Sequence, residues 1–316
     1  MIHFGASRPV GETLRVDSDT KGSPLGAMGL ICFAAVLFGT VGTALAQAPD
    51  GTPSVSAATL RLLVGGGALA ILAREWNLSG RRFSVATGAL GVAVYQTMFF
   101  VATSSTGVAM ASLVTIGVSP LASRLIGVVR GRPEPPTLWW VSAVVLVGGV
   151  TVLVVGGYEE ISARPAGVVA AVIAGFAYAG YTEVGSHLLD EGVPPTAAMA
   201  SIFLGGGVLL APTLPFLDNS WVAQGRGLLV LLYIGLITLT VAYLAFGRGL
   251  ARLQPSTVVM LTILEPVVAA AASGLLLDQT LRPLGWLGAG LVVAGLPIVA
   301  RSERGRLEGG ATSVPT

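Results

Sequence analysis

The chain has 316 residues, of which 53% are hydrophobic and 11% are charged, and its formal net charge is +2. Soluble proteins carry about 25% charged residues, so this composition excludes an ordinary soluble protein and indicates an integral membrane protein. The small net charge gives no field for binding nucleic acid. One cysteine and two histidines exclude a disulfide within the chain and a cysteine-based metal cluster, so we expect neither a metal nor a cofactor.

Ten apolar stretches follow one another along the chain. A helix needs about 20 mostly apolar residues to cross a bilayer, and none of the stretches shows the alternation typical of a membrane β-barrel. We expect membrane spans at residues 26–46, 55–73, 85–103, 108–129, 138–156, 165–188, 196–214, 227–246, 257–277 and 284–300. The sequence therefore predicts an all-α polytopic membrane protein with ten transmembrane helices.

The two ends of the chain are polar. We expect residues 1–25 and 302–316 to be disordered tails, because they have too few apolar residues to form a core. Between the tails lie two blocks of five spans each, at 26–156 and 165–301. We expect these blocks to be the structural units of the protein.

The distribution of Lys and Arg predicts how the chain is oriented, because cytoplasmic loops carry an excess of these residues. With the N-terminus in the cytoplasm, 13 of the 18 Lys and Arg residues fall in cytoplasmic segments, three fall on the other side and two lie within spans. The loop at 189–195 is the exception, because it is expected in the cytoplasm and has no Lys or Arg. We therefore expect both termini, with their tails, in the cytoplasm.

The two blocks resemble each other in sequence. A shift of 140 residues places the glycines at 65–67 on those at 205–207, and a shift of 146 places Pro120 on Pro266. Because five is an odd number, the second block must cross the membrane in the opposite sense to the first. The sequence thus predicts two inverted five-helix repeats, which are typical of secondary transporters with a substrate site near the midplane between the halves.

The end of each block carries a further resemblance. Residues 119–149, beginning with Ser119 and Pro120, and residues 264–295, beginning with Leu264, Glu265 and Pro266, resemble the closing part of each repeat in EamA-type members of the drug/metabolite transporter superfamily. This resemblance implies substrate movement across the bacterial inner membrane, commonly export of amino acids or other small metabolites. It also implies a central cavity built by the first four helices of each half, with the fifth helices at the periphery.

Four ionisable residues lie inside predicted spans: Arg61, Arg124, Glu183 and Glu265. A charge there costs about 2.5–3.5 kcal/mol on insertion scales, so each is a functional candidate. Their depths permit two ion pairs, Arg61–Glu265 and Arg124–Glu183. We predict that Arg61, Glu183 and Glu265 bind substrate or couple transport. For Arg124 and Glu183 the alternative is that the side chain reaches the cytoplasmic interface.

Proton coupling is a hypothesis that rests on the two carboxylates, Glu183 and Glu265. His187 follows Glu183 by four positions and projects from the same helix face. A proton relay is one interpretation of this pair, because His titrates near neutral pH. The alternative is a histidine at a wet helix end.

Aromatic and polar side chains recur in three of the predicted spans. They are Tyr95, Gln96 and Phe99 in the third span, Tyr178 in the sixth and Tyr243 in the eighth. Aromatic rings with polar tips beside a cavity predict binding of a moderately apolar or aromatic metabolite. The alternative is that these residues pack the helices together or lie at the membrane interface.

Two prolines lie in the middle of predicted spans at equivalent positions of the repeats. Pro120 frees the carbonyl of Ile116, and Pro266 frees that of Thr262. Freed carbonyls near the midplane can bind a substrate amine or an ion, and the alternative is a kink that shapes packing. We predict that both prolines act as gating hinges.

These features together predict a secondary active transporter, an exporter of amino acids or similar small metabolites across the cytoplasmic (inner) membrane by alternating access. The expected partners are a small-molecule metabolite, membrane lipids and, if transport is coupled, protons. The sequence has no G-x-x-x-x-G-K-[ST] motif, so ATP is not expected to drive it directly. The alternative function is an intramembrane enzyme acting on lipid-linked substrates.

Overall fold

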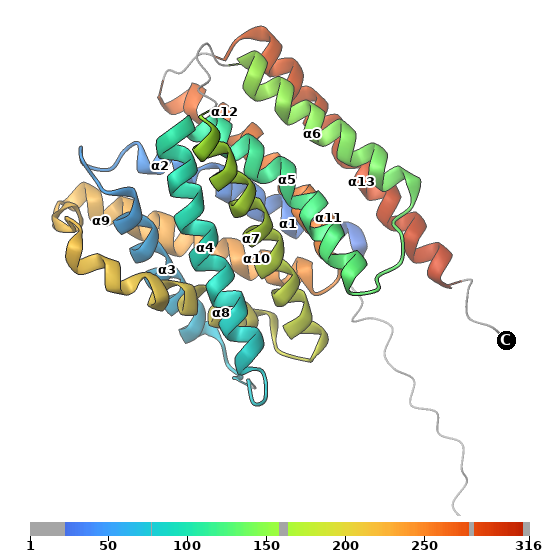
Figure 1. The fold of residues 1–316 in the computed structure, drawn as a ribbon, viewed down its shortest axis with the longest axis horizontal. Helices are drawn as coiled ribbons and strands as arrows, with labels where there is room; N and C mark the ends of the chain where they lie inside the picture. Colours follow the sequence, from blue (N-terminus) through green and yellow to red (C-terminus); the bar gives the residue numbers. More distant parts are fainter. Residues whose placement is uncertain (1–22, 77, 158–163, 278–280, 312–316) are drawn as a thin grey trace, which may run out of the picture.

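The computed structural model describes residues 23–76, 78–157, 164–277 and 281–311, and all of the regular secondary structure in these ranges is helical. Ten helical segments in the described ranges are long and apolar enough to cross a membrane. Their positions agree with the ten expected spans to within a few residues at most ends. The protein is therefore an all-α, multi-pass membrane protein (Figure 1).

The first half contains five spans, of which the first is interrupted. Its helices are α1 (Pro24–Gly39) and α2 (Val41–Leu45) in the first span, then α3 (Ser54–Leu72), α4 (Arg82–Thr106), α5 (Val108–Val129) and α6 (Thr137–Gly157).

The second half also contains five spans, and two of these are interrupted. The sixth span is α7 (Pro165–Asp190). The seventh span is α8 (Pro195–Leu210), which continues into the 3-10 turn η2 (Ala211–Phe216). A second 3-10 turn, η3 (Ser220–Ala223), lies in the loop that follows. The eighth span joins α9 (Gly225–Leu232), the π-helix η4 (Tyr233–Val241) and α10 (Ala242–Leu250). The ninth span consists of α11 (Pro255–Leu261) and α12 (Leu264–Leu276), and the tenth is α13 (Pro283–Ala311).

Several helices begin at a proline. Pro24, Pro165, Pro195 and Pro255 are the first residues of α1, α7, α8 and α11. Proline suits this position because its missing N–H would have no partner within the helix, and because its fixed φ already matches the helix. These prolines therefore set where the spans start.

The halves are interleaved rather than separate. Helix α4 packs along α7, α3 along α8, and α1 along α10 and α12, so helices of one half lie against helices of the other. The fifth span of each half lies outside this arrangement: α6 and α13 run side by side along one edge of the molecule (Figure 1). The peripheral position implied for the fifth helices is thus present.

Close contact between α6 and α13 depends on glycine. A Cβ placed on Gly288 would lie 2.2 Å from the backbone nitrogen of Leu153, and one on Gly149 would lie 2.9 Å from that of Val292. No side chain fits at such distances. Small residues allow the two backbones to approach, as is common between membrane helices.

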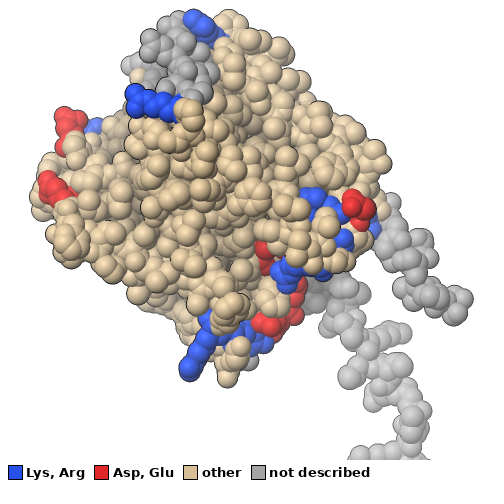
Figure 2. Space-filling model, in the orientation of Figure 1, with Lys and Arg blue, Asp and Glu red and all other residues tan. Residues whose placement is uncertain are grey.

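The arginines gather at one end of the bundle, where α1, α4, α6, α8 and α11 begin. We call this the Arg-rich end; its arginines are Arg74, Arg81, Arg82, Arg130, Arg132, Arg248, Arg252, Arg301, Arg304 and Arg306. Figure 2 shows positive side chains along the lower and right edges of the molecule and fewer at the top, whereas the middle of this face is almost uncharged. An uncharged belt between polar ends is what a bilayer requires.

Helix α13 extends further than the sequence analysis expected. Residues 302–311 are helical, although a disordered tail was expected from 302 onward. Ser302 and Glu303 are buried, the Thr257 hydroxyl donates to Glu303 Oε2 at 3.1 Å, and Arg306 pairs with Glu303. These contacts hold the segment against α11. The expected tails at 1–22 and 312–316 lie outside the described residues.

Candidate functional site

A cavity of about 300 Å³ lies between the two halves. The first half contributes α2, α5 and α6, and the second half contributes α12. The described residues that line the cavity are Gly42, Thr43, Ala46, Val108, Ala109, Ser112, Ile116, Leu153, Val154, Glu265, Pro266, Ala269, Ser273 and Leu277. Two of them, Leu153 and Val154, belong to a fifth span, so the wall is not limited to the first four helices of each half as the resemblance implied.

Glu265 is the one ionisable side chain among these described lining residues. It lies in the first turn of α12, directly after the break between α11 and α12, and its N–H donates to the carbonyl of Thr262 at 2.9 Å. The positive end of the helix dipole favours a carboxylate there. On the other side, a Cβ on Gly39 would lie 2.7 Å from the Glu265 carbonyl oxygen, so the end of α1 packs directly against this turn.

From Glu265 the cavity follows one face of α12. Glu265, Ala269, Ser273 and Leu277 are spaced by four residues and all line it, as residues on one helix face do. Sequence reasoning missed Ser273, although this spacing was a signal that could have found it. The cavity therefore runs from mid-span to the end of the bundle opposite the Arg-rich end, where Val108 is exposed.

The two mid-span prolines differ in their local structure. Helix α5 continues through Pro120, whereas the ninth span is interrupted just before Pro266. In α5 the Ser119 hydroxyl donates to the Ile116 carbonyl at 2.9 Å and so replaces the hydrogen bond that Pro120 removes. A hinge at either proline stays a prediction.

Arg61 does not form the ion pair with Glu265 that its depth in the membrane would permit. Its Nε donates to the Ile234 carbonyl at 3.2 Å and its Nη2 donates to the Thr238 carbonyl at 3.1 Å. Both carbonyls belong to the π-helix η4. In a π-helix, backbone hydrogen bonds join residues five positions apart instead of the four of an α-helix. Nothing in the sequence indicated a π-helix, and depth along the spans left the partner of Arg61 open.

Glu183 also pairs with residues other than Arg124, the partner that depth would permit. Its side chain is 3% exposed, accepts from the Ser123 hydroxyl at 2.8 Å and pairs with Arg132 Nη1, 2.8 Å from its Oε2. Arg130 lies 3.8 Å away. Arg124 pairs instead with Glu134 at 2.7 Å.

The turn after α5 explains the choice of Arg132. Gly131 has a φ of 70°, which a residue with a side chain adopts only with strain. The Arg132 N–H donates to the Gly127 carbonyl and the Gly131 N–H to the Val128 carbonyl, both at 2.9 Å. This Schellman motif folds the chain back over the helix end, so that Arg132 reaches α7.

His187 does not form a relay with Glu183. Its Nε2 lies 3.5 Å from Glu191 Oε1, and both side chains are partly exposed at the Arg-rich end. The interpretation of His187 as a histidine at a wet helix end agrees with this position.

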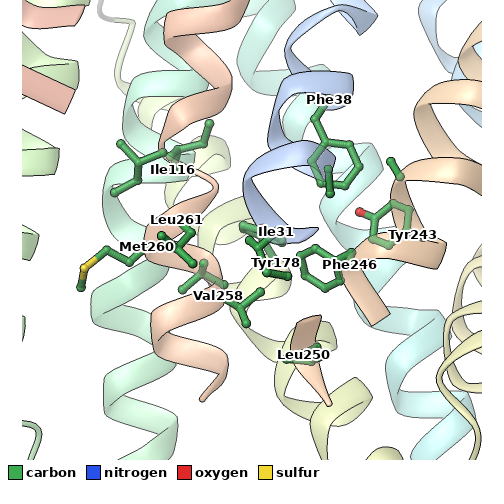
Figure 3. Close-up of a cluster of buried hydrophobic side chains, with 14 of the residues drawn as sticks. Ile31, Phe38, Ile116, Tyr178, Tyr243, Phe246, Leu250, Val258, Met260 and Leu261 are labelled. Atoms are coloured by element: carbon green, nitrogen blue, oxygen red, sulfur yellow. The ribbon is translucent and has the colours of Figure 1, made fainter. Parts of the chain in front are cut away.

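The predicted aromatic residues come together, but away from the cavity wall. The rings of Tyr95 and Tyr178 are 5.9 Å apart and those of Tyr95 and Phe99 are 5.8 Å apart. The Tyr178 hydroxyl hydrogen-bonds to Thr262 at 2.8 Å, and the Tyr243 ring packs against those of Phe38 and Phe246 (Figure 3). Tyr181 belongs to the same aromatic cluster. Sequence reasoning missed three further members: Phe38, Phe203 and Phe246.

The aromatic cluster closes the bundle on one side of Glu265. Thr262, which Tyr178 contacts, lies one turn nearer the Arg-rich end than Glu265 does. The Tyr181 and Tyr243 hydroxyls are 3.2 Å apart, and Gln96 is buried in α4 without lining the cavity. Access to Glu265 is therefore from the end opposite the Arg-rich end.

Comparison with known proteins gives a family model that matches both halves. The model of the EamA-like transporter family matches residues 25–155 and again residues 165–301. A crystal structure with 20% sequence identity superposes with a TM-score of 0.72, covering 90% of this chain and all of that one. At this identity the superposition shows the shared fold alone.

Three relatives are named as transporters, exporters or pumps. The chain is 32% identical to the "Uncharacterized transporter YwfM" of Bacillus subtilis (strain 168), covering 87% of this chain and 93% of that protein. It is 26% identical to a "Probable terminal-alkyne amino-acid exporter" of Streptantibioticus cattleyicolor, and the match covers 81% of this chain and 87% of that protein. It is also 34% identical to the "Probable amino-acid metabolite efflux pump" of Escherichia coli (strain K12), over 100 residues. This match covers 32% of this chain and 31% of that protein.

Proposed function

This chain belongs to the EamA-like transporter family, and we propose that it is a secondary active transporter that exports amino acids or similar small metabolites across the cytoplasmic membrane by alternating access. The observation that carries this proposal is the cavity of about 300 Å³ between the two halves, with Glu265 on its wall near mid-span. Its volume is at the lower end of the range for small-molecule sites. The relatives named as amino-acid exporters and efflux pumps support the substrate class.

One-sided access to this cavity supports alternating access. The cavity extends from Glu265 to the end opposite the Arg-rich end, while the aromatic cluster and the Glu183–Arg132 pair close the other side. Inverted repeats allow the same two halves to adopt the opposite arrangement. With the N-terminus in the cytoplasm, the present arrangement is the outward-facing one.

Within this function, Glu265 is the carboxylate best placed to carry a proton. It is partly exposed to the cavity, whereas Glu183 is held by Ser123 and Arg132. A group that takes up and releases protons must meet water in at least one state. We therefore assign proton coupling to Glu265 and closure of the Arg-rich end to Glu183.

Flux measurements in proteoliposomes test the transport function. Purified protein is expected to move radiolabelled amino acids or related metabolites, and a pH gradient is expected to change the rate. Glu265→Gln should abolish the effect of the gradient, while Glu183→Gln should retain it. Turnover of a lipid-linked substrate without any flux would contradict the proposal and favour an intramembrane enzyme.

A further inference from the structure

The wall of the cavity is acidic and apolar, without a basic side chain among the described residues. Its one ionisable group there is the Glu265 carboxylate, and its other polar side chains are the hydroxyls of Thr43, Ser112 and Ser273. The Ser273 hydroxyl donates to the carbonyl of Ala269 within its own helix, so its oxygen is left to accept. The side chains on this wall therefore offer more hydrogen-bond acceptors than donors, which suits a ligand with a cationic donor group.

The Glu265 carboxylate has no hydrogen-bond donor and no ion-pair partner in the part of the chain that the structure describes. The nearby cation, Arg61, uses its Nε and Nη2 on the carbonyls of Ile234 and Thr238. An unpaired carboxylate at mid-membrane is costly. A bound ammonium group would supply the missing charge-assisted hydrogen bonds.

The break before α12 is unsuited to an anion. The start of an interrupted helix usually binds anions through free backbone N–H groups. Here the Glu265 N–H already donates to Thr262, Pro266 has no N–H, and Glu265 itself adds a negative charge. The start of an interrupted helix, which binds anions in other proteins, therefore favours a cation in this protein.

The remaining wall is formed largely by apolar side chains. Ile116, Leu153, Val154 and Leu277 face the space of about 300 Å³. Such a surface accepts a small apolar body by removing it from water. It penalises a carboxylate, because a buried charge without a partner is strongly unfavourable.

We propose that this cavity selects small monovalent amines, with one ammonium group and an apolar body, over the zwitterionic amino acids that carry the same side chain. The ammonium group lies at Glu265 and the apolar body lies along α5 and α6. This inference rests on the proposed transport function and narrows its substrate class from amino acids and similar small metabolites to amines.

Two matched pairs of ligands test the inference: isoamylamine against leucine, and phenethylamine against phenylalanine. The members of each pair differ only in the carboxylate. Isothermal titration calorimetry with the purified full-length protein in detergent is expected to give at least tenfold tighter binding of each amine. Glu265→Gln keeps the size of the side chain and is expected to weaken amine binding at least tenfold.

The matched control is Glu303→Gln, which changes a buried carboxylate far from the cavity and is expected to leave amine binding unchanged. The comparison within each ligand pair uses the wild-type protein, so it stands even if a variant does not fold. Equal or tighter binding of the amino acid, no binding of either ligand, or full amine binding by folded Glu265→Gln would overturn the inference.

Flux in proteoliposomes separates this inference from the transport function on which it rests. If the amines bind through Glu265 but are not moved across the bilayer, the site assignment stands and the transport function fails. If leucine is moved while the amines neither bind nor compete, the transport function stands and the amine selectivity fails.

Discussion

At the scale of single residues, the pair formed by Glu183 and Arg132 connects the two halves at the Arg-rich end. Glu183 lies on α7 of the second half, and Arg132 follows α5 of the first half. The Glu183 carboxylate is almost fully buried, so water screens its charge only weakly. Its negative charge is therefore balanced mainly by Arg132. Opening of the Arg-rich end would have to separate the two side chains.

We expect Glu183→Gln to lower the free energy of unfolding by about 1–2 kcal/mol, because the variant loses a charge-assisted hydrogen bond between a buried carboxylate and the partly buried Arg132. The Gln side chain still accepts from Ser123, which limits the loss. Arg132→Gln should give a similar value. The double variant should lose less than the sum, with a coupling energy of about 1 kcal/mol. Titration with SDS in mixed micelles measures these values.

The pair Arg81–Glu191 serves as the control, because it also joins the halves but its carboxylate is more exposed, with 37% of the Glu191 side chain accessible against 3% for Glu183. An exposed pair contributes about 0–1 kcal/mol, so Glu191→Gln should have a smaller effect than Glu183→Gln. Additive losses in the Glu183/Arg132 double variant would show that the two residues do not act as a pair.

At the scale of helices, interruptions in three spans surround the candidate site. The first span breaks at Thr40, the eighth contains the π-helix η4, and the ninth breaks at Thr262 and Ile263. The Thr40 hydroxyl lies 2.9 Å from the Tyr233 hydroxyl, at the start of η4. Interrupted helices are tolerated at membrane depth where other protein groups satisfy the freed backbone, and Arg61 does this for η4.

Glycine contacts between α6 and α13 give a prediction at the same scale. Gly288→Leu places a side chain where a Cβ alone would lie 2.2 Å from the Leu153 nitrogen and 2.6 Å from the Gly149 carbonyl. The helices must separate, and we expect the free energy of unfolding to fall by about 1–3 kcal/mol. Gly290, two residues further on, has nothing within 4 Å of a Cβ.

Gly290→Leu is therefore the matched control, and it should be neutral or slightly stabilising because leucine is a better helix former than glycine by about 0.8 kcal/mol. Apparent melting temperatures in detergent compare the two variants. An equal loss in both would show that close packing of α6 on α13 is not the cause.

At the scale of the whole molecule, the excess of arginine at one end predicts the orientation in the membrane. We expect a green fluorescent protein fused after residue 316 to fluoresce, and an alkaline phosphatase fused at the same place to be inactive, because the excess of arginine predicts a C-terminus in the cytoplasm. A phosphatase fused within residues 217–224, on the opposite side, should be active. The reverse pattern would contradict the orientation and would make the present cavity inward-facing.

Much of the architecture could be predicted from the sequence, because a bilayer requires long apolar helices with charges at their ends. All ten spans lie where the apolar stretches predicted. The helix ends were less accurate where tertiary contacts decide them. Thr257 and Arg306 fix Glu303 and so extend α13 beyond its apolar part.

The candidate site was predicted only in part. Glu265 was identified because a carboxylate at mid-span is costly, and the structure places it on the cavity wall. The partners of Arg61 and Glu183 could not be predicted, because depth along a helix does not reveal which face meets which neighbour. Gly131 was a usable signal for the turn that brings Arg132 to Glu183, whereas nothing in the sequence indicated η4.

The sequence by itself determined the class of protein, the number of spans, the repeat and the short set of charges inside the membrane. These follow from local hydropathy and from counting, which need no knowledge of contacts. Only the tertiary structure decided that Glu265 faces a cavity, that Arg61 holds the π-helix η4, and that the aromatic residues close one side of the site. The physical reason is that each of these features depends on the packing of helices that are distant in the chain.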